Sequence, residues 1–395
     1  MQDIFDRNWG ISMARIERSL TSLEASALVS PKTEINLTDG HPRARLTASQ
    51  RLITATIPGM FDEAFERPFA DIERCAQVAF YDCMGQVSAP IGAGRMLTSY
   101  SSTIALDIVA RVLAERMDEV AVLHPTFDNI ADLFRARGLR LQPVTEQQLD
   151  DDSWHPPAGI GAVVVVTPNN PTGWILREES LRRLAADCAQ AGQVLVMDSS
   201  FRGQDSRAHY DTYRVLEESG VEWAVVEDTG KLWSVNELKA GFLSWSAGST
   251  LRFTSAFDEV MLSVSAVILL LVTKLAVDAK AGGFGEMRSS LAANRRLFAS
   301  VLEGTPMELT DPGSRISVAR VTLPDEGPDA HEVYRALVER GIHTLPCSRF
   351  YWAFPEDGDR QLRLSLSRPA ETVERAARAL AEICQPDRGR IEVPL

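Results

Sequence analysis

The sequence predicts an α/β fold with a mainly parallel sheet in a large domain and a smaller α+β domain. Between about residues 120 and 245, short apolar runs of strand length alternate with helical segments, and this alternation is typical of a parallel sheet. From about residue 289 the pattern changes to helices mixed with shorter alternating strands. A chain of 395 residues is long enough for both domains.

The expected domain boundaries follow these changes in pattern. We assign residues 1–36 to an N-terminal helical arm that closes over the site, 37–70 to part of the small domain, 71–288 to the large domain and 289–395 to the C-terminal small domain. The arm contains a helix around residues 20–24, which ends before Ser30 and Pro31. A polar loop follows at 36–42, and 47–85 is mostly helical.

The remaining elements are predicted from apolar runs and periodicity. We expect helices at 104–113, 129–138 and 178–191, and large-domain strands at 120–123, 162–166, 194–197, 223–226 and 242–245. The small domain should contain strands at 316–321, 343–346 and 362–366. The most apolar run, 266–272, is shorter than the roughly 20 residues of a membrane span and predicts a buried helix.

Composition restricts the class of partner. The chain is 45% hydrophobic and 24% charged, as soluble globular proteins are. Its net charge of −13 argues against nucleic acid or an anionic membrane as the main partner. The five cysteines are scattered, without a CxxC pair or metal-ligand spacing, so we expect a cytoplasmic protein with no metal site.

Two neighbouring strands end in residues that suit one chemistry. The strand at 194–197 runs into Asp198, and the strand at 223–226 leads to Lys231. Ligands bind beyond the carboxyl ends of such strands, so these two side chains should meet. An amine and a carboxylate are the two groups that hold pyridoxal phosphate (PLP), the amine at its aldehyde and the carboxylate at its ring nitrogen. A salt bridge at a sheet edge is the other interpretation.

Three further motifs each allow a functional and a structural interpretation. Ser101, Ser102 and Thr103 begin a helix, where they suit a phosphate or simply cap the helix. Phe127 follows a strand and could stack on a flat ring or pack in the core. Asn170 lies in Asn-Pro-Thr-Gly after a four-valine strand, where it could bind a ring oxygen or a carboxylate, or belong to an ordinary turn.

Two cations complete the set. Lys239 lies eight residues after Lys231 and suits a phosphate. Arg363 lies inside an apolar strand, where a substrate carboxylate is the natural bidentate partner. The wet face of an edge strand is the alternative position for this arginine.

In this order the motifs resemble those of fold-type I PLP enzymes of the aminotransferase class I/II family, over roughly residues 36–390. The resemblance implies a seven-stranded sheet, a homodimer, and PLP held as a Schiff base on Lys231. It further implies that Asp198 binds the ring nitrogen, Phe127 stacks on the ring, Asn170 contacts the ring hydroxyl and Arg363 binds the substrate carboxylate. The phosphate would lie against Ser101, Ser102, Thr103, Ser200 and Lys239.

Two positions depart from this family's common pattern. Phe201 stands where many aminotransferases have a tyrosine that donates to the ring hydroxyl, and Asp228 stands where a phosphate-binding serine is common. A carboxylate beside phosphate would be repelled, so we expect Asp228 to face a cation, either Lys231 or a cationic substrate side chain.

These departures resemble a narrower group, the PLP- and O2-dependent L-arginine oxidases and hydroxylases of guanidino natural-product pathways. The resemblance matches Thr21 and Glu24 in the arm, and Asp39 and His41 in the following loop, to substrate-binding residues. Glu24 and Asp228 would flank the guanidinium, and His41, titrating near neutral pH, would position or deprotonate a water. The implied products are a dehydro-2-oxo acid or 4-hydroxy-2-oxoarginine, with H2O2 and ammonia.

Two other functions are compatible with parts of the pattern. The shared scaffold also suits an ordinary PLP-dependent aminotransferase. A non-catalytic PLP-binding regulator would need a DNA-binding head, for which the first 36 residues are too short and lack a basic patch.

Overall fold

A computed structural model describes residues 19–28, 30–31, 33–235 and 237–384. Its large domain contains a seven-stranded sheet in the order β2-β8-β7-β6-β5-β3-β4, in which β8 runs opposite to the other strands. The predicted α/β fold is thus confirmed. The strands are β2 (Met96–Ser99), β3 (Glu119–His124), β4 (Arg140–Thr145), β5 (Ala162–Val166), β6 (Val194–Asp198), β7 (Glu222–Asp228) and β8 (Gly241–Trp245).

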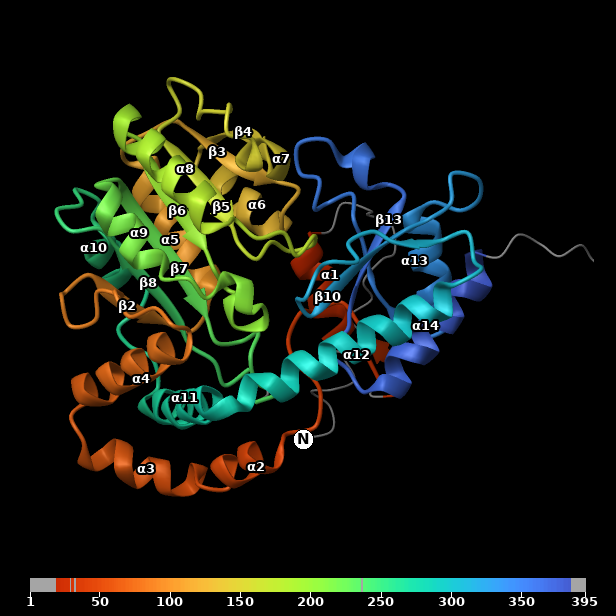
Figure 1. Ribbon diagram of the computed structural model, residues 1–395. Helices are drawn as coiled ribbons and strands as arrows, with labels where there is room; N and C mark the ends of the chain where they lie inside the picture. Colours follow the sequence, from red (N-terminus) through yellow and green to blue (C-terminus); the bar gives the residue numbers. More distant parts are fainter. Residues whose placement is uncertain (1–18, 29, 32, 236, 385–395) are drawn as a thin grey trace, which may run out of the picture.

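Helices cover both faces of this sheet (Figure 1), which explains why every residue of β5 and β6 is buried. Their bounds are α4 (Phe69–Cys83), α5 (Ser102–Ala114), α6 (Asp128–Ala136), α7 (Glu146–Asp150), α8 (Glu178–Ala191), α9 (Thr212–Ser219), α10 (Phe253–Asp258) and α11 (Ala266–Asp278). The predicted buried helix at 266–272 is part of α11. Among the described residues no helix is long and apolar enough to cross a membrane.

The smaller domain is built on a four-stranded antiparallel sheet in the order β12-β13-β10-β9. Its strands are β9 (Glu308–Leu309), β10 (Val318–Thr322), β12 (Leu345–Pro346) and β13 (Gln361–Ser365), and its helices are α12 (Phe284–Leu302), α13 (Ala330–Glu339) and α14 (Ala370–Cys384). The single strand predicted at 343–346 is wrong. Residues Ile342–His343 form β11, which pairs in parallel with β1 (Ile35–Asn36), and Thr344 separates it from β12.

Residues 37–70, expected in the small domain, divide between the two hydrophobic cores. Leu37 packs in the small-domain core, whereas Met60 packs in the core of the large domain. The helices α2 (Ala48–Thr54) and α3 (Ile57–Glu66) lie beside α11. Short helical segments complete the chain: η1 (Arg202–Gln204), η2 (Ser206–Ala208), η3 (Ala279–Gly283) and η4 (Pro355–Gly358).

The arm forms a helix, α1 (Leu20–Leu28), at the junction of the two domains (Figure 1). Its first backbone N–H, that of Leu20, donates to Asp128 of α6 at 2.9 Å. The Leu20 side chain is buried with Leu345 and Phe350 of the smaller domain. The described part of the arm therefore contacts both domains.

Candidate active site

The carboxyl ends of β5, β6 and β7 bring the predicted polar residues to one edge of the sheet. In the strand register, Asp198 lies between Val166 and Val226. Asn170 follows β5, and Lys231 follows β7. The positive charge of Lys231 acts on the carboxylate of Asp198, so the structure places both at one site.

Asp198 is a buried carboxylate whose environment is set by Ser200. Burial raises the pKa of Asp198 to about 6, although the Ser200 hydroxyl and N–H, which donate to Oδ1 at 2.5 and 2.9 Å, oppose the rise. We expected Ser200 at a phosphate. In this structure its hydroxyl instead orients Asp198.

Lys231 lies in surroundings that favour its neutral form. Burial lowers the pKa of this amine, and the nearby carboxylates of Glu24 and Asp228 oppose the shift. Its Nζ lies 5.6 Å from the centre of the Phe201 ring. A lysine with a lowered pKa is a better nucleophile and proton acceptor near neutral pH.

The N-terminus of α5 holds a carboxylate where a phosphate was expected. Asp228 Oδ2 accepts from Ser102 N at 2.8 Å, and its Oδ1 accepts from Gly230 N. Ser101 caps the helix by accepting from Ile104 N at 3.4 Å. Asp228 thus binds two backbone N–H groups, and its charge also acts on Lys231, one of the two cations that we expected it to face. These N–H groups are donors suited to an oxyanion.

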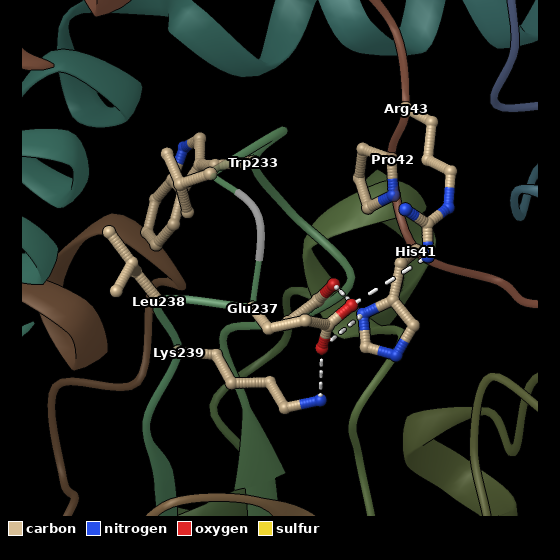
Figure 2. Close-up of a pocket in the computed structure, with 9 residues that line it drawn as sticks. His41, Pro42, Arg43, Trp233, Glu237, Leu238 and Lys239 are labelled. Carbon is tan, nitrogen blue, oxygen red and sulfur yellow. Dashed lines mark hydrogen bonds and ion pairs between the residues drawn. The ribbon is translucent and has the colours of Figure 1, made fainter. Parts of the chain in front are cut away.

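A small pocket beside this edge contains Lys239 (Figure 2). Lys239 Nζ donates to Glu237 Oε2 at 2.7 Å, and the same carboxylate lies 3.7 Å from His41 Nδ1. Gly230 makes this close packing possible. A Cβ there would lie 2.7 Å from both Asp228 Oδ1 and Lys239 Cδ, and 3.2 Å from the His41 ring.

His41 is held in one orientation by the backbone of the lysine loop. Its Nδ1 lies 2.8 Å from Gly230 O, so Nδ1 carries the proton and Nε2 keeps its lone pair. Burial and the charges of Lys231 and Lys239 lower the pKa of His41 well below its usual value. The expectation that His41 titrates near neutral pH is therefore wrong. It is a neutral imidazole there, able to accept a proton at Nε2.

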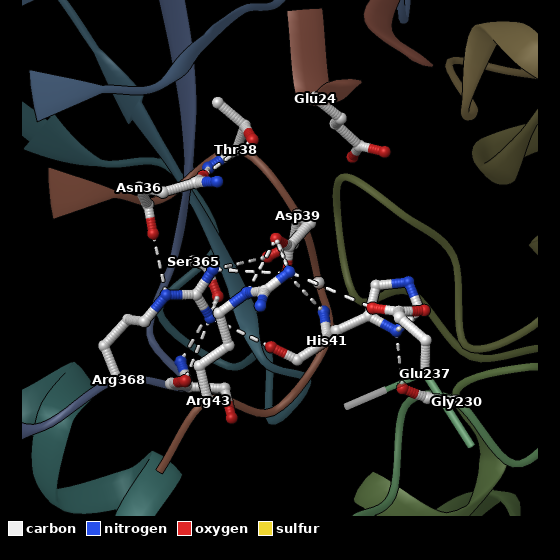
Figure 3. Close-up of polar contacts among 12 residues, drawn as sticks. Glu24, Asn36, Thr38, Asp39, His41, Arg43, Gly230, Glu237, Ser365 and Arg368 are labelled. Carbon is white, nitrogen blue, oxygen red and sulfur yellow. Dashed lines mark hydrogen bonds and ion pairs between the residues drawn. The ribbon is translucent and has the colours of Figure 1, made fainter. Parts of the chain in front are cut away.

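Asp39 is fixed by two arginines (Figure 3). Its Oδ2 accepts from Arg43 at 2.9 and 3.0 Å, and its Oδ1 accepts from Arg368 at 3.2 Å and from His41 N at 3.0 Å. These cations hold the pKa of Asp39 below its usual value despite burial. Asp39, expected to bind substrate, orients the His41 loop in this structure. A role for Arg368 was not predicted from the sequence, because Ser-Arg-Pro at 367–369 is not a recognisable site motif.

Arg363 and Glu24 form a buried ion pair between the smaller domain and the arm. Arg363 is 0% exposed, donates from Nη1 to Thr38 O, and donates from Nη2 to Glu24 Oε1 at 3.3 Å. Its Nε has no hydrogen-bond partner within the described chain. Burial raises the pKa of Glu24, which Arg363 only partly offsets. Thr21, one turn earlier on α1, is exposed.

Among the residues expected around the cofactor ring, one buried polar atom has no hydrogen-bond partner in the described chain. Asn170 is 7% exposed, and its Oδ1 finds no hydrogen-bond partner among the described residues. The adjacent Asn169 is fully used, with Nδ2 donating to Pro125 O at 2.8 Å and to Glu146 at 2.7 Å. Phe127 is partly buried, with its ring centre 5.9 Å from that of Phe350.

Phe201 supports the loop that carries His41. It is 4% exposed and packs with Ile316 and Val318. Gly40 lies directly against it, because a Cβ on Gly40 would be 3.1 Å from Phe201 Cζ. The phenylalanine at 201, where many aminotransferases have tyrosine, is therefore packed directly against Gly40 of the 38–42 loop.

The fold and the lysine–aspartate pair at the sheet edge define a PLP-type site on an aminotransferase scaffold. A family model for aminotransferase class I and II matches residues 72–380, and the chain belongs to that family.

Known proteins place the chain within this family more finely. The structure of MppP soaked with the product 2-ketoarginine is 42% identical, superposes with a TM-score of 0.86, and covers 89% of this chain and 99% of its own. An aspartate aminotransferase from Thermus thermophilus with maleate shares the fold alone, with 18% identity, a TM-score of 0.75 and coverage of 93% and 96%. The aromatic aminotransferase ISS1 of Arabidopsis thaliana is 25% identical over 191 residues, which span 47% of this chain and 46% of ISS1.

The residues present fit the PLP that this family implies. The unpaired Asn170 Oδ1 would accept a hydrogen bond from the ring hydroxyl. The N-terminus of α5 and Lys239, whose donors bind Asp228 and Glu237 in this structure, are groups that suit a phosphate. Lys231 would hold the aldehyde carbon and Asp198 the ring nitrogen. Once bound, the cofactor would withdraw electrons from the bonds at a substrate's α-carbon.

Proposed function

We propose that this protein oxidises L-arginine with O2, to a dehydro-2-oxo acid or to 4-hydroxy-2-oxoarginine, with release of H2O2 and ammonia. The observation that carries the proposal is the Glu24–Arg363 pair: the charge of Glu24 acts on Lys231, and the buried Arg363 donates to Glu24 at 3.3 Å. The site thus offers one cation and one anion. The match to MppP with 2-ketoarginine supports a substrate of this type.

Substrate binding would exchange the partners of this pair. The substrate α-carboxylate would take Arg363, whose unpaired Nε and whose Nη2, once released by Glu24, would form a bidentate fork. Glu24 would then be a buried carboxylate without a cation, which is costly. The guanidinium of arginine supplies that cation. An amino acid with a neutral side chain supplies no such cation. Glu24 would therefore couple recognition of the substrate's α-carboxylate to recognition of its guanidinium.

Two side chains would accept protons in the proposed reaction. Lys231, with its lowered pKa, can accept the substrate's α-proton at Nζ. His41, with Nδ1 bound to Gly230 O, can accept a proton from water at Nε2 as that water adds to the substrate carbon that becomes hydroxylated. Phe201, whose ring centre lies 5.6 Å from Lys231 Nζ, carries no hydroxyl, so this residue cannot supply a phenolic proton.

Oxygen consumption tests the proposal. The holoenzyme should consume O2 with L-arginine in the absence of any 2-oxo acid, with H2O2 and ammonia appearing in step. In ¹⁸O-labelled water, mass spectrometry should find the label in the new hydroxyl. His41→Phe should retain O2 uptake and lose the hydroxylated product. An enzyme that consumes no O2 with L-arginine is not an arginine oxidase.

An ordinary aminotransferase is the second candidate, favoured by the family match and by the relation to ISS1. It predicts transfer of the amino group from arginine to an added 2-oxo acid without O2 uptake. Measuring both products in one reaction mixture separates the two functions.

We also propose that the protein is a homodimer, as the family resemblance implies. Light scattering coupled to gel filtration should give twice the chain mass, and a monomer mass would remove this proposal.

A further inference from the structure

A second cavity lies away from the active site, against α12. It has a volume of about 650 Å³ and is lined by parts of α12, by Leu309 and residues 312–315 of the smaller domain, and by Gln204 and Ser206 of the large domain. In Figure 1, α12 runs from beside α11 into the smaller domain. The cavity is therefore bounded by both domains.

Four arginines line this cavity, and the described residues of its wall include no carboxylate. They are Arg288, Arg295, Arg296 and Arg315. The chain as a whole carries a net charge of −13, so a concentration of positive charge is not a general property of its surface. Local charge of one sign inside a concave wall raises the concentration of the opposite ion there.

These arginines are poorly neutralised by the protein. Arg295, 8% exposed, donates to the carbonyl oxygens of Ile316 and Val318 at 3.0 and 2.7 Å, and no carboxylate lies within 4.0 Å of it in the described chain. Arg288 donates to Gly203 O at 2.8 Å and contacts no carboxylate there either.

The two exposed arginines of the cavity, Arg296 and Arg315, have the fewest polar contacts with the protein. Arg315 lies 4.0 Å from Asp205, whose carboxylate already pairs with Arg207 at 2.6 Å. Arg296 makes neither an ion pair nor a side-chain hydrogen bond in the part of the chain that the structure describes. Most other arginines of the described chain lie within 4.0 Å of a carboxylate. The charge in this wall is therefore available to a ligand.

We propose that this cavity is a second ligand site, which binds a small polyanion with at least two oxyanion groups. Guanidinium forks match phosphate and carboxylate geometry, and several in one wall favour a multivalent anion over a single one. The cavity volume lies within the range of small-molecule sites, roughly 300–1,000 Å³. Neither the arginine substrate nor any step of its oxidation requires this cavity.

Gln204 connects the cavity to the active site. Its Nε2 donates to Lys231 O at 2.6 Å, and its Oε1 accepts from Ser317 N at 2.6 Å. An anion held between α12 and residues 312–315 would thus lie against Gln204. Gln204 joins the backbone at Lys231 to the smaller domain. Its binding should reduce the relative motion of the two domains.

Calorimetry on the PLP-loaded protein tests the site with pyrophosphate and citrate as probes of the two oxyanion types. We expect at least one to bind with a Kd below about 1 mM and to weaken as NaCl is raised. The visible absorbance of the cofactor should not change, because the probe does not compete for the cofactor's phosphate position. Absence of binding by both probes, or binding only with loss of cofactor, would overturn the proposal.

Variants at the exposed arginines locate the binding. Arg296→Gln and Arg315→Gln should each weaken the better probe about tenfold, as loss of one charged hydrogen bond does, with unchanged circular dichroism. Arg375→Gln is the matched control, since Arg375 is exposed on α14, outside the cavity, and forms no ion pair in the described chain. Equal affinity in all three variants would place the binding elsewhere and sink the proposal.

Discussion

Glu24 and Asp39 are two carboxylates whose charges act on the same lysine, Lys231, and their pKa values shift in opposite directions. Asp39 is 4% exposed and is bound by two arginines and a backbone N–H. Glu24 is 20% exposed and has one arginine at 3.3 Å, which also donates to a carbonyl oxygen. Burial costs both carboxylates, and the number of cations decides the sign. Asp39 is therefore part of the scaffold, whereas Glu24 can change partner.

The largest effect is expected at Lys231, on which both carboxylates act. Lys231→Ala should abolish O2 uptake and remove the visible absorbance of bound cofactor, because no amine remains to hold the aldehyde. Spectrophotometry and borohydride labelling measure this directly. Lys280→Ala, at an exposed lysine paired with Asp82, should change neither. A coloured, borohydride-labelled Lys231→Ala protein would contradict the site.

Asp39→Asn tests whether Asp39 has a structural role. It leaves the buried cation of Arg368 without its carboxylate, so the free energy of unfolding in urea should fall by about 3 kcal/mol at pH 7. The folded pKa of Asp39 lies below its unfolded value near 4. The stabilisation is thus present above about pH 4 and is lost as pH falls through the folded pKa. Asp39→Asn/Arg368→Gln should lose less than the sum of the single variants.

Glu24→Gln tests whether Glu24 exchanges Arg363 for the substrate guanidinium. KM for L-arginine should rise about tenfold or more, and activity toward the neutral analogue L-citrulline should rise relative to arginine. Because burial raises the folded pKa of Glu24, its ionisation at pH 7 costs stability, and this offsets part of the loss of Arg363's anionic partner. The free energy of unfolding in urea should therefore fall by less than in Asp39→Asn. A loss of stability equal to that of Asp39→Asn would break the comparison.

A smaller effect is expected from the titration of Asp198. With its pKa at about 6 in the cofactor-free protein, Asp198 is ionised above that pH and can stabilise a protonated ring nitrogen. Affinity of the cofactor-free protein for PLP should therefore fall about tenfold for each pH unit below 6, measured by quenching of protein fluorescence. Asp198→Asn should bind PLP more weakly and lose this pH dependence. An unchanged pH profile would show that another group titrates.

The sheet edge could be predicted from the sequence, and the surrounding ionic contacts could not. Asp198 and Lys231 follow apolar strands, and parallel strand ends meet wherever such strands occur, so local pattern suffices. Arg368 binds Asp39, which is 329 residues away, and Gln204 binds Ser317, which is 113 residues away, so no local pattern encodes these contacts. His41 was assigned to the site, but its pKa depends on burial and on two lysines brought near by folding.

The small domain shows the same limit. Residues 343–346 were predicted as one short alternating strand, yet the chain changes partner at Thr344, from β1 to β13. Both short strands satisfy their backbone hydrogen bonds with segments remote in sequence. Only the packing of the arm and of β13 decides where the change occurs.

The contact between Gly40 and Phe201 constrains how this chain could acquire transaminase-like features. The Phe201 Cζ atom, which would carry a tyrosine hydroxyl, is the atom nearest to the position of a Gly40 Cβ, at 3.1 Å. Restoring tyrosine at 201 would thus add an oxygen where the His41 loop already packs. Tyrosine at 201 would therefore require the 38–42 loop to shift, and this loop carries His41. A single substitution at 201 would thus alter both the proton donors of the site and the placement of its histidine.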